Sequence, residues 1–215
     1  MPPTKDRYHH GDLREELLRA SLQLIESEGL AAVSLRKVAR EAGVSPGAPY
    51  HHFADRAALM SALAARGFEI LGAAMTSACE ATTDPRAALI AMATGYVDFA
   101  RDHAAYFRIM FRPELSQPEK HPDTEAAGDA AFAVLESAVA DAVASGFLPA
   151  ADAETMALAW WSLAHGMAAL TVDGKFALRA TQSGTTPAAL TARITGIFAD
   201  LIDRGAGDRG GSGVG

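Results

Sequence analysis

Apolar residues recur along most of the chain at three- and four-residue spacing, the pattern of helices that bury one face. The first helix is expected over residues 12–28, where Leu13, Leu17 and Leu24 share a face. Gly29 ends it, because a glycine just after the last periodic residue is a common helix stop.

A second, short helix, LRKVAREA, is expected after Ser34, an N-cap residue type. Leu35 and Val38 face inward, and the bases Arg36, Lys37 and Arg40 face outward. Gly43 ends this helix, because glycine readily adopts the left-handed conformation that follows a helix.

The stretch GVSPGAPYHHF then begins a third short helix. Ser45 is its N-cap candidate, and Pro46 stands at the first helical position, where a missing N–H costs nothing. Pro49 falls where the first intrahelical hydrogen bond should form, which predicts a tight or irregular opening turn. With Val44 filling the space between the two short helices, residues 34–53 have the layout of a helix-turn-helix.

The rest of the chain alternates periodic segments with Gly, Pro and Asp. Further helices are expected over 55–79, 84–102, 104–111, 124–146, 152–174 and 187–205, with a polar loop over 112–122. No stretch predicts a strand, so the expected class is all-α with about nine helices. The glycine-rich tail after Gly205 is expected to be flexible.

Composition bears on the size of the core and on the cellular compartment. Of 215 residues, 49% are hydrophobic, which suffices for a sizeable core, and the single cysteine excludes an intrachain disulfide. Residues 155–172 contain no Asp, Glu, Lys or Arg, but His165, Gly166 and flanking acids favour a buried helix over a membrane span. With no apolar signal near residue 1, the expected location is the cytoplasm.

The net charge of −7 is unevenly distributed. Residues 1–70 hold nine Lys/Arg and nine Asp/Glu, and the remainder holds ten bases and seventeen acids. This asymmetry indicates two regions with different partners.

Residues 12–66 resemble the DNA-binding domain of the tetracycline-repressor (TetR) family of transcriptional regulators. The resemblance is carried by Gly29 and Ser34 ahead of LRKVAREAGVS, and then by Gly47, Tyr50, His52, Phe53, Arg56 and Leu59. Arg56 stands where the family usually has lysine, and Ala48-Pro49 stands where it often has Thr-Leu.

The resemblance implies contacts with double-stranded operator DNA. Tyr50, His52 and Arg56 would reach phosphates, and Phe53 would anchor the core. The whole expected DNA-binding set is Ser34, Arg36, Ser45, Gly47, Ala48, Tyr50, His51, His52 and Arg56. The alternatives are that Tyr50 covers a domain edge and that the bases after Ser34 form a solvated face.

The expected domains are residues 1–54, including a basic arm over 1–11 that could enter a minor groove, and residues 55–205, followed by the tail 206–215. Beyond about residue 80 the chain looks like one subgroup of the family, with a Trp-His-Gly signature read here as Trp160 or Trp161 and then His165-Gly166.

The family pattern implies a homodimer formed by the last two long helices, and a pocket for a small-molecule effector in the larger domain. The expected interface residues are Trp160, Leu163, Met167, Leu190, Ile194, Ile197, Phe198 and Leu201. The expected pocket residues are Tyr96, Phe99, Tyr106, Met110, Phe111, Trp161 and His165. Core packing is the alternative for every member of both sets.

No cofactor or metal is expected. Adjacent histidines such as His51 and His52 point about 100° apart on a helix and have no Cys or carboxylate at ligand spacing. The chain has no nucleophile elbow, His-rich metal motif or phosphate loop. The interpretation is a ligand-responsive repressor that binds palindromic DNA; a binding or assembly module and a small helical enzyme are the alternatives.

Overall fold

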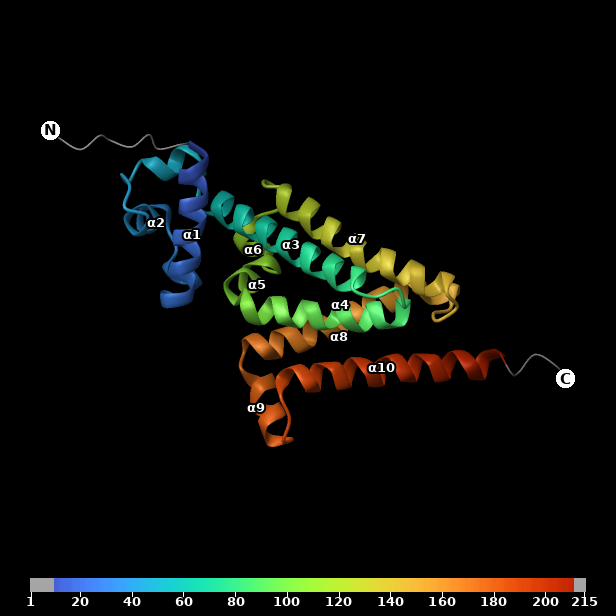
Figure 1. Ribbon diagram of the computed structural model, residues 1–215. Coiled ribbons are helices and arrows are strands. Elements are labelled where there is room, and N and C mark those ends of the chain that lie inside the picture. Colours follow the sequence, from blue (N-terminus) through green and yellow to red (C-terminus); the bar gives the residue numbers. More distant parts are fainter. Residues whose placement is uncertain (1–9, 211–215) are drawn as a thin grey trace. The chain divides into compact units, whose positions relative to one another are not determined.

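The computed structural model describes residues 10–210, and its described part is built of helices without a strand (Figure 1). The all-α expectation is therefore confirmed. The α-helices are α1 (His10–Glu28), α2 (Leu35–Glu41), α3 (Arg56–Glu80), α4 (Pro85–Asp102), α5 (Ala104–Met110), α6 (Pro113–Ser116), α7 (Asp123–Ala144), α8 (Ala153–Val172), α9 (Lys175–Gln182) and α10 (Pro187–Gly210). Three 3-10 helices complete the set: η1 (Leu30–Ala32), η2 (Ala48–His51) and η3 (Ala150–Asp152).

The described residues form two compact units, each assembled from two stretches of the chain. The first unit contains the described residues up to Arg66 together with Ala105–Ala126. The second unit contains Gly67–Ala104 and the described residues from Ala127 onward. A division at residue 54 into functional domains remains a prediction.

The first unit has a core of large aliphatic side chains. Leu17, Val38, Leu59 and Leu63 are all completely buried there, and Phe53 joins the same cluster, as its expected core role requires. Each such side chain contributes about 1.5–3 kcal/mol by leaving water. This core fixes α1, α2 and the start of α3 around the segment that follows Gly43.

Caps and glycines set the helix ends in the first unit as the sequence predicts. Ser34 Oγ accepts a hydrogen bond from Lys37 N at 3.3 Å, and Asp55 Oδ1 accepts one from Ala58 N at 2.8 Å. Gly43 has a φ of +68°, the left-handed region that a side chain penalises. The turn between α2 and the next element is therefore specified locally.

The second unit is assembled from longer helices. α8 and α10 both pack against α4, and Trp160 meets Phe198 edge-on with ring centroids 5.1 Å apart. Gly72 of α3 lies next to Ala131 of α7, because small residues let these two helices approach closely. Alanine thus makes up a larger share of the buried side chains here than in the first unit, beside large ones such as Leu89 and Trp160.

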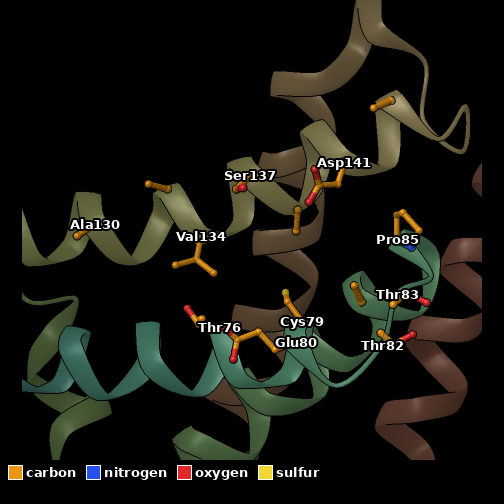
Figure 2. A pocket seen from close by; sticks show the side chains of 14 residues that line it. Thr76, Cys79, Glu80, Thr82, Thr83, Pro85, Ala130, Val134, Ser137 and Asp141 are labelled. Carbon is orange, nitrogen blue, oxygen red and sulfur yellow. The ribbon is translucent and has the colours of Figure 1, made fainter.

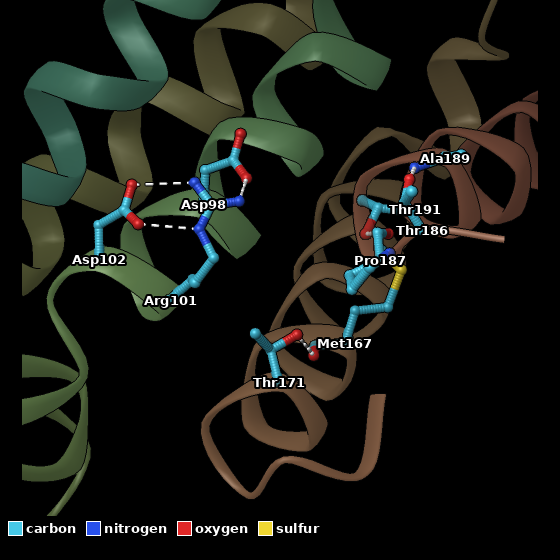
Figure 3. Close-up of polar contacts among 9 residues, drawn as sticks. All are labelled: Asp98, Arg101, Asp102, Met167, Thr171, Thr186, Pro187, Ala189 and Thr191. Atoms are coloured by element: carbon cyan, nitrogen blue, oxygen red, sulfur yellow. Dashed lines mark hydrogen bonds and ion pairs between the residues drawn. The ribbon is translucent and has the colours of Figure 1, made fainter. Parts of the chain in front are cut away.

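Polar contacts at helix ends hold the second unit at its surface (Figure 3). Arg101, near the end of α4, pairs with Asp98 and with Asp102. Thr186 Oγ1 accepts a hydrogen bond from Ala189 N at 3.2 Å and so caps α10. Such exposed pairs and caps define helix ends more than they stabilise the fold.

Three α-helices differ from the sequence prediction. α6 stands inside the expected polar loop, begun by Pro113, and α9 was not predicted at all. α9 buries only Phe176 and Ala180, a pattern too short to show periodicity. α10 continues to Gly210 instead of ending at Gly205, since a glycine inside a helix costs only about 1 kcal/mol. Residues 211–215 of the tail lie outside the described range.

Within the described range, α3 is the one helix long and apolar enough to cross a membrane. Half of its apolar window is buried inside the protein, which is how a core helix behaves. The charge-free segment 155–172 forms α8, whose Trp160, Ala164 and Met167 are buried as expected for a packed helix.

Candidate functional site

The segment after Gly43 makes a 3-10 turn rather than an α-helix. η2 has Gly47 at its N-cap position and Pro49 buried within it. Both His52 N and Phe53 N donate to the Pro49 carbonyl, at 3.0 and 2.9 Å. The expected irregular opening turn is therefore confirmed, and the reason is Pro49, which cannot donate the first hydrogen bond of an α-helix.

The prediction that Ser45 caps this element was wrong. The element begins three residues later, at Ala48, and no side chain caps it. The Ser45 carbonyl instead accepts a hydrogen bond from Ala48 N at 3.0 Å, in a turn that precedes the helix. This leaves the hydroxyl of Ser45 on the surface, because Ser45 is exposed.

The predicted DNA-facing side chains of this segment gather on its outer side. Tyr50 is 51% exposed, which is high for a tyrosine, and His51 and Gly47 are also exposed. Ala48 and His52 are half-buried, and His52 packs at 6.4 Å from the Phe53 ring. Buried Pro49 and Phe53 thus anchor a turn whose polar and aromatic groups point outward.

The helix before this turn adds bases to the same region of the chain. Ser34, Arg36 and Arg40 are exposed, whereas the ammonium of Lys37 pairs with Glu28. Arg36 and Arg40 lie one turn apart on α2 and so share a face of it. These two guanidinium groups are suited to contact phosphate.

Arg56 has a structural task that the sequence did not reveal. Its Nε donates to the Val33 carbonyl at 2.9 Å, and its terminal nitrogen donates to the Leu30 carbonyl at 3.0 Å. These bonds tie the start of α3 to the residues around η1. A guanidinium has five N–H donors, so Arg56 keeps donors for a phosphate beside these two hydrogen bonds. The phosphate contact by Arg56 therefore stays a prediction.

Two further expectations concern the N-terminal arm and metal binding. The arm over residues 1–11 lies almost wholly outside the described residues, so its minor-groove role is untested. Within the described range, no three His, Cys, Asp or Glu side chains are grouped as a metal site.

The predicted effector-pocket residues fall in both units. Tyr96, Phe99, Trp161 and His165 belong to the second unit, and Tyr106, Met110 and Phe111 belong to the first.

Within the second unit, a hydrogen bond of 3.0 Å joins Tyr96 Oη to His165 Nδ1, and the Trp161 ring lies 5.9 Å from the His165 ring. Burial raises the pKa of Tyr96, which a hydrogen bond from Trp161 partly opposes, and burial lowers the pKa of His165. Both groups are thereby kept neutral, so the hydrogen bond joins two uncharged side chains.

The predicted interface residues divide into three classes by burial. Trp160 and Met167 are buried inside the second unit, at 2% and 4% exposure, so they pack in its own core. Ile197 and Leu201 of α10 are 51% and 60% exposed. Leu158 and Leu170 of α8, which were not predicted, are also exposed, at 46% and 47%. The remaining predicted members, Leu163, Leu190, Ile194 and Phe198, are half-buried.

The sequence analysis missed a cavity in the second unit. About 830 Å³ of space lies between α3, α7 and the start of α4 (Figure 2). None of the predicted pocket residues lines it. Its walls are mainly Ala, Thr and Ser, residue types whose spacing carries no recognisable signal.

An N-terminal helix-turn-helix together with a larger helical unit is the architecture of a helix-turn-helix transcriptional regulator. Residues 17–63 match the family described as "Bacterial regulatory proteins, tetR family", and residues 89–195 match "Tetracyclin repressor-like, C-terminal domain". The chain belongs to the TetR family.

Named relatives agree with this assignment. The HTH-type transcriptional regulator BetI of Stenotrophomonas maltophilia is 29% identical over 119 residues, 51% of this chain and 61% of that protein. BetI of Yersinia pestis is 32% identical over 94 residues, 43% of this chain and 48% of that protein. The match thus spans about half to three-fifths of these relatives. They are regulators, not enzymes.

Solved structures share the fold over nearly the whole chain. A Rhodococcus sp. RHA1 protein of unknown function is 34% identical, with a TM-score of 0.77 over 94% of this chain and 98% of that one. The TetR family regulator PfmR of Thermus thermophilus is 23% identical, with a TM-score of 0.66 over 87% and 97%, and it supports the fold alone.

Proposed function

We propose that this chain is a cytoplasmic, ligand-responsive transcriptional repressor that binds palindromic operator DNA as a homodimer and is released by a small-molecule effector. The observation that carries the proposal is the outward face of η2, where Tyr50 and His51 are exposed while Pro49 is buried. Residues 1–54 bind DNA in this proposal, and residues 55–205 bind the effector and the partner subunit.

Some of the proposed contacts position the protein on the DNA backbone, and others read the base sequence. Tyr50, His52 and Arg56 contact phosphates, and Ser45, Ala48 and His51 meet base edges in the major groove. Exposed Gly47 allows the backbone to approach the groove closely. Ser34 and Arg36 contact the neighbouring strand from the start of α2.

The homodimer has a geometric purpose. Two recognition elements must lie about 34–36 Å apart to meet successive major grooves, and a second subunit supplies the mate. The apolar side chains of α8 and α10 that the fold leaves exposed, Leu158, Leu170, Ile197 and Leu201, form the proposed subunit interface. Half-buried Leu163, Leu190, Ile194 and Phe198 border them.

Effector release follows from population shift. A ligand that prefers the conformation with mis-spaced recognition elements lowers operator occupancy, and a coupling of about 1–3 kcal/mol changes affinity about 5- to 150-fold. The hydrogen-bonded Tyr96–His165 pair beside Trp161 supports a polar anchor for the effector in an aromatic surrounding.

Replacing Tyr50 with Ala tests the DNA-binding surface. Loss of one phosphate contact should weaken operator affinity about 5- to 10-fold in a gel-shift titration with DNA from beside the coding region. Tyr50→Phe keeps the ring and removes only the hydroxyl, so it should lose affinity to a similar extent if the hydroxyl makes the phosphate contact. Unchanged affinity of the Ala variant, with the helical spectrum intact, would refute the assigned surface.

Replacing Leu201 with Glu tests the interface. A charge placed in a buried apolar contact should convert the dimer to monomers at micromolar concentration in analytical ultracentrifugation. Leu178→Glu is the control, because Leu178 is similarly exposed, at 53%, but lies on α9. A wild-type chain that sediments as a monomer would contradict the dimer directly.

A further inference from the structure

The cavity between α3 and α7 lies wholly within the second unit and has a lining unlike that of the Tyr96–His165 cluster. Figure 2 shows the side chains of α3 and α7 facing each other across it, with the connection to α4 closing one end. Its volume of about 830 Å³ is in the range of small-molecule sites.

Every formal charge in the lining is negative. Glu80 comes from the end of α3 and Asp141 from α7, and the fourteen lining residues include no Lys, Arg or His. Neither carboxylate takes part in a hydrogen bond or ion pair with another described residue. Both carboxylates are exposed, so water screens part of their charge, but no base in the lining compensates it on the space between the helices.

Hydroxyl groups add neutral hydrogen-bond acceptors. Thr76 and Thr83 lie on the α3 side of the cavity, and Ser137 lies on the α7 side, one turn before Asp141. A hydroxyl oxygen has two lone pairs and accepts readily from N–H. An occupant with several N–H donors would thus find partners on both walls.

The remaining wall is apolar and made of small side chains. It is formed by Pro85, Ala88, Ala130, Ala133, Val134, Ala138 and Ala144. Short side chains leave room for a hydrocarbon group, and contact with them removes its surface from water at about 25 cal/mol per Å². The cavity therefore suits an amphipathic molecule.

The pKa of the half-buried Cys79 thiol responds to the charges that line the cavity. Its pKa is raised by burial first, then by the charges of Asp141 and Glu80. The thiol therefore stays protonated and neutral, and both carboxylates act on the interior of the cavity from opposite helices.

We propose that this cavity binds a protonated organic amine, with its ammonium group between Glu80 and Asp141 and its hydrocarbon part against the alanine wall. The two carboxylates repel anions, and a neutral molecule would not neutralise their negative charge. A metal ion is disfavoured, because the described residues offer no group of three ligands. The inference concerns binding by the second unit and stands independently of DNA binding.

Calorimetric titration of the full chain with three probes of one length tests the ligand class, in the absence of DNA. Hexylamine, hexanol and hexanoate share a hydrocarbon part and differ in charge. Hexylamine should bind, and the other two should bind at least about tenfold more weakly, since charge-assisted hydrogen bonds are the strong ones. Equal affinities, or no heat from millimolar hexylamine, would overturn the proposal.

Two substitutions and a matched control test the place. Asp141→Asn and Glu80→Gln should each weaken hexylamine binding about 3- to 10-fold, the reduced effect expected of charges that are partly solvated. Glu136→Gln removes the same charge from α7 at an exposed position that does not line the cavity, and should leave the affinity unchanged.

Equal effects of all three variants would mean that hexylamine responds to net charge alone, which would refute the site. The N,N,N-trimethyl derivative of hexylamine, which keeps the charge without N–H donors, should bind at least about threefold more weakly than hexylamine if the hydroxyls contribute. These titrations need no operator, so their failure leaves the proposed DNA binding untouched.

Discussion

The two units fill their interiors with different proportions of small and large side chains. The first unit buries mainly leucine, isoleucine, valine and methionine together with Phe53, and leaves Tyr50 half exposed. The second unit buries a larger share of alanine beside large side chains such as Leu89 and Trp160, and contains a hydrogen-bonded Tyr96–His165 pair. It also retains a cavity of about 830 Å³ and exposes Ile197 and Leu201.

This difference teaches where binding capacity resides in each unit. A rigid, well-filled core can hold a short turn in one conformation, which suits recognition of a fixed surface. Small-residue packing leaves space and apolar surface, which suits a ligand and a second subunit.

Leu17→Ala should destabilise the protein by about 2–5 kcal/mol, because it opens a cavity in the filled core of the first unit. Leu17 is completely buried, so the loss includes both transfer and packing. Urea unfolding followed by circular dichroism measures it. Leu178→Ala, at a position 53% exposed in the second unit, should change stability by less than about 0.5 kcal/mol. Similar losses for the two variants would break the comparison.

Gly43→Ala should cost about 1–2 kcal/mol, the strain of placing a side chain at φ +68°. No atom lies within 4 Å of the added Cβ, so the cost is conformational and not steric. Gly47→Ala is the control: with φ −86° and open space it should be neutral or up to about 1 kcal/mol stabilising. If Gly47 approaches DNA, that same variant should still lose operator affinity.

Acidification should have the smallest effect on stability, through the half-buried His165 of the second unit. Burial lowers the pKa of His165, so below the ordinary value of about 6.5 the unfolded chain takes up a proton that the folded unit resists. The contribution of His165 to stability is therefore complete above that value and declines as the pH falls below it. Comparing urea unfolding at neutral and mildly acidic pH, His165→Gln should show a smaller decline than the wild type. An equal decline would place the proton uptake elsewhere.

Much of the first unit could be predicted from the sequence because its signals are local. Ser34 and Asp55 cap helices as their residue types suggest, and Gly43 has the expected left-handed backbone. Pro49 correctly predicted an irregular turn, although the absence of a cap by Ser45 was not foreseen. Arg56 shows the limit: its carbonyl partners lie more than twenty residues away in sequence, so no spacing reveals them.

Most helices of the second unit could be predicted from the sequence, but its cavity could not. Periodicity located α4, α7 and α8, but α9 shows only two buried positions. The cavity depends on which alanines of α7 face α3, and alanine marks neither a core nor a surface position by its type. The pairing of Tyr96 with His165 likewise joins residues of separate helices and appears only in the folded chain.

In the 3-10 turn at Ala48–His51, buried and exposed positions are neighbours: Pro49 is buried, and Tyr50 and His51 are exposed. Because Pro49 and Phe53 are its buried anchors, the exposed positions Gly47, Tyr50 and His51 can be exchanged with little effect on folding. In the proposed complex with DNA, a change of sequence preference would then require only a handful of surface substitutions on an unchanged scaffold.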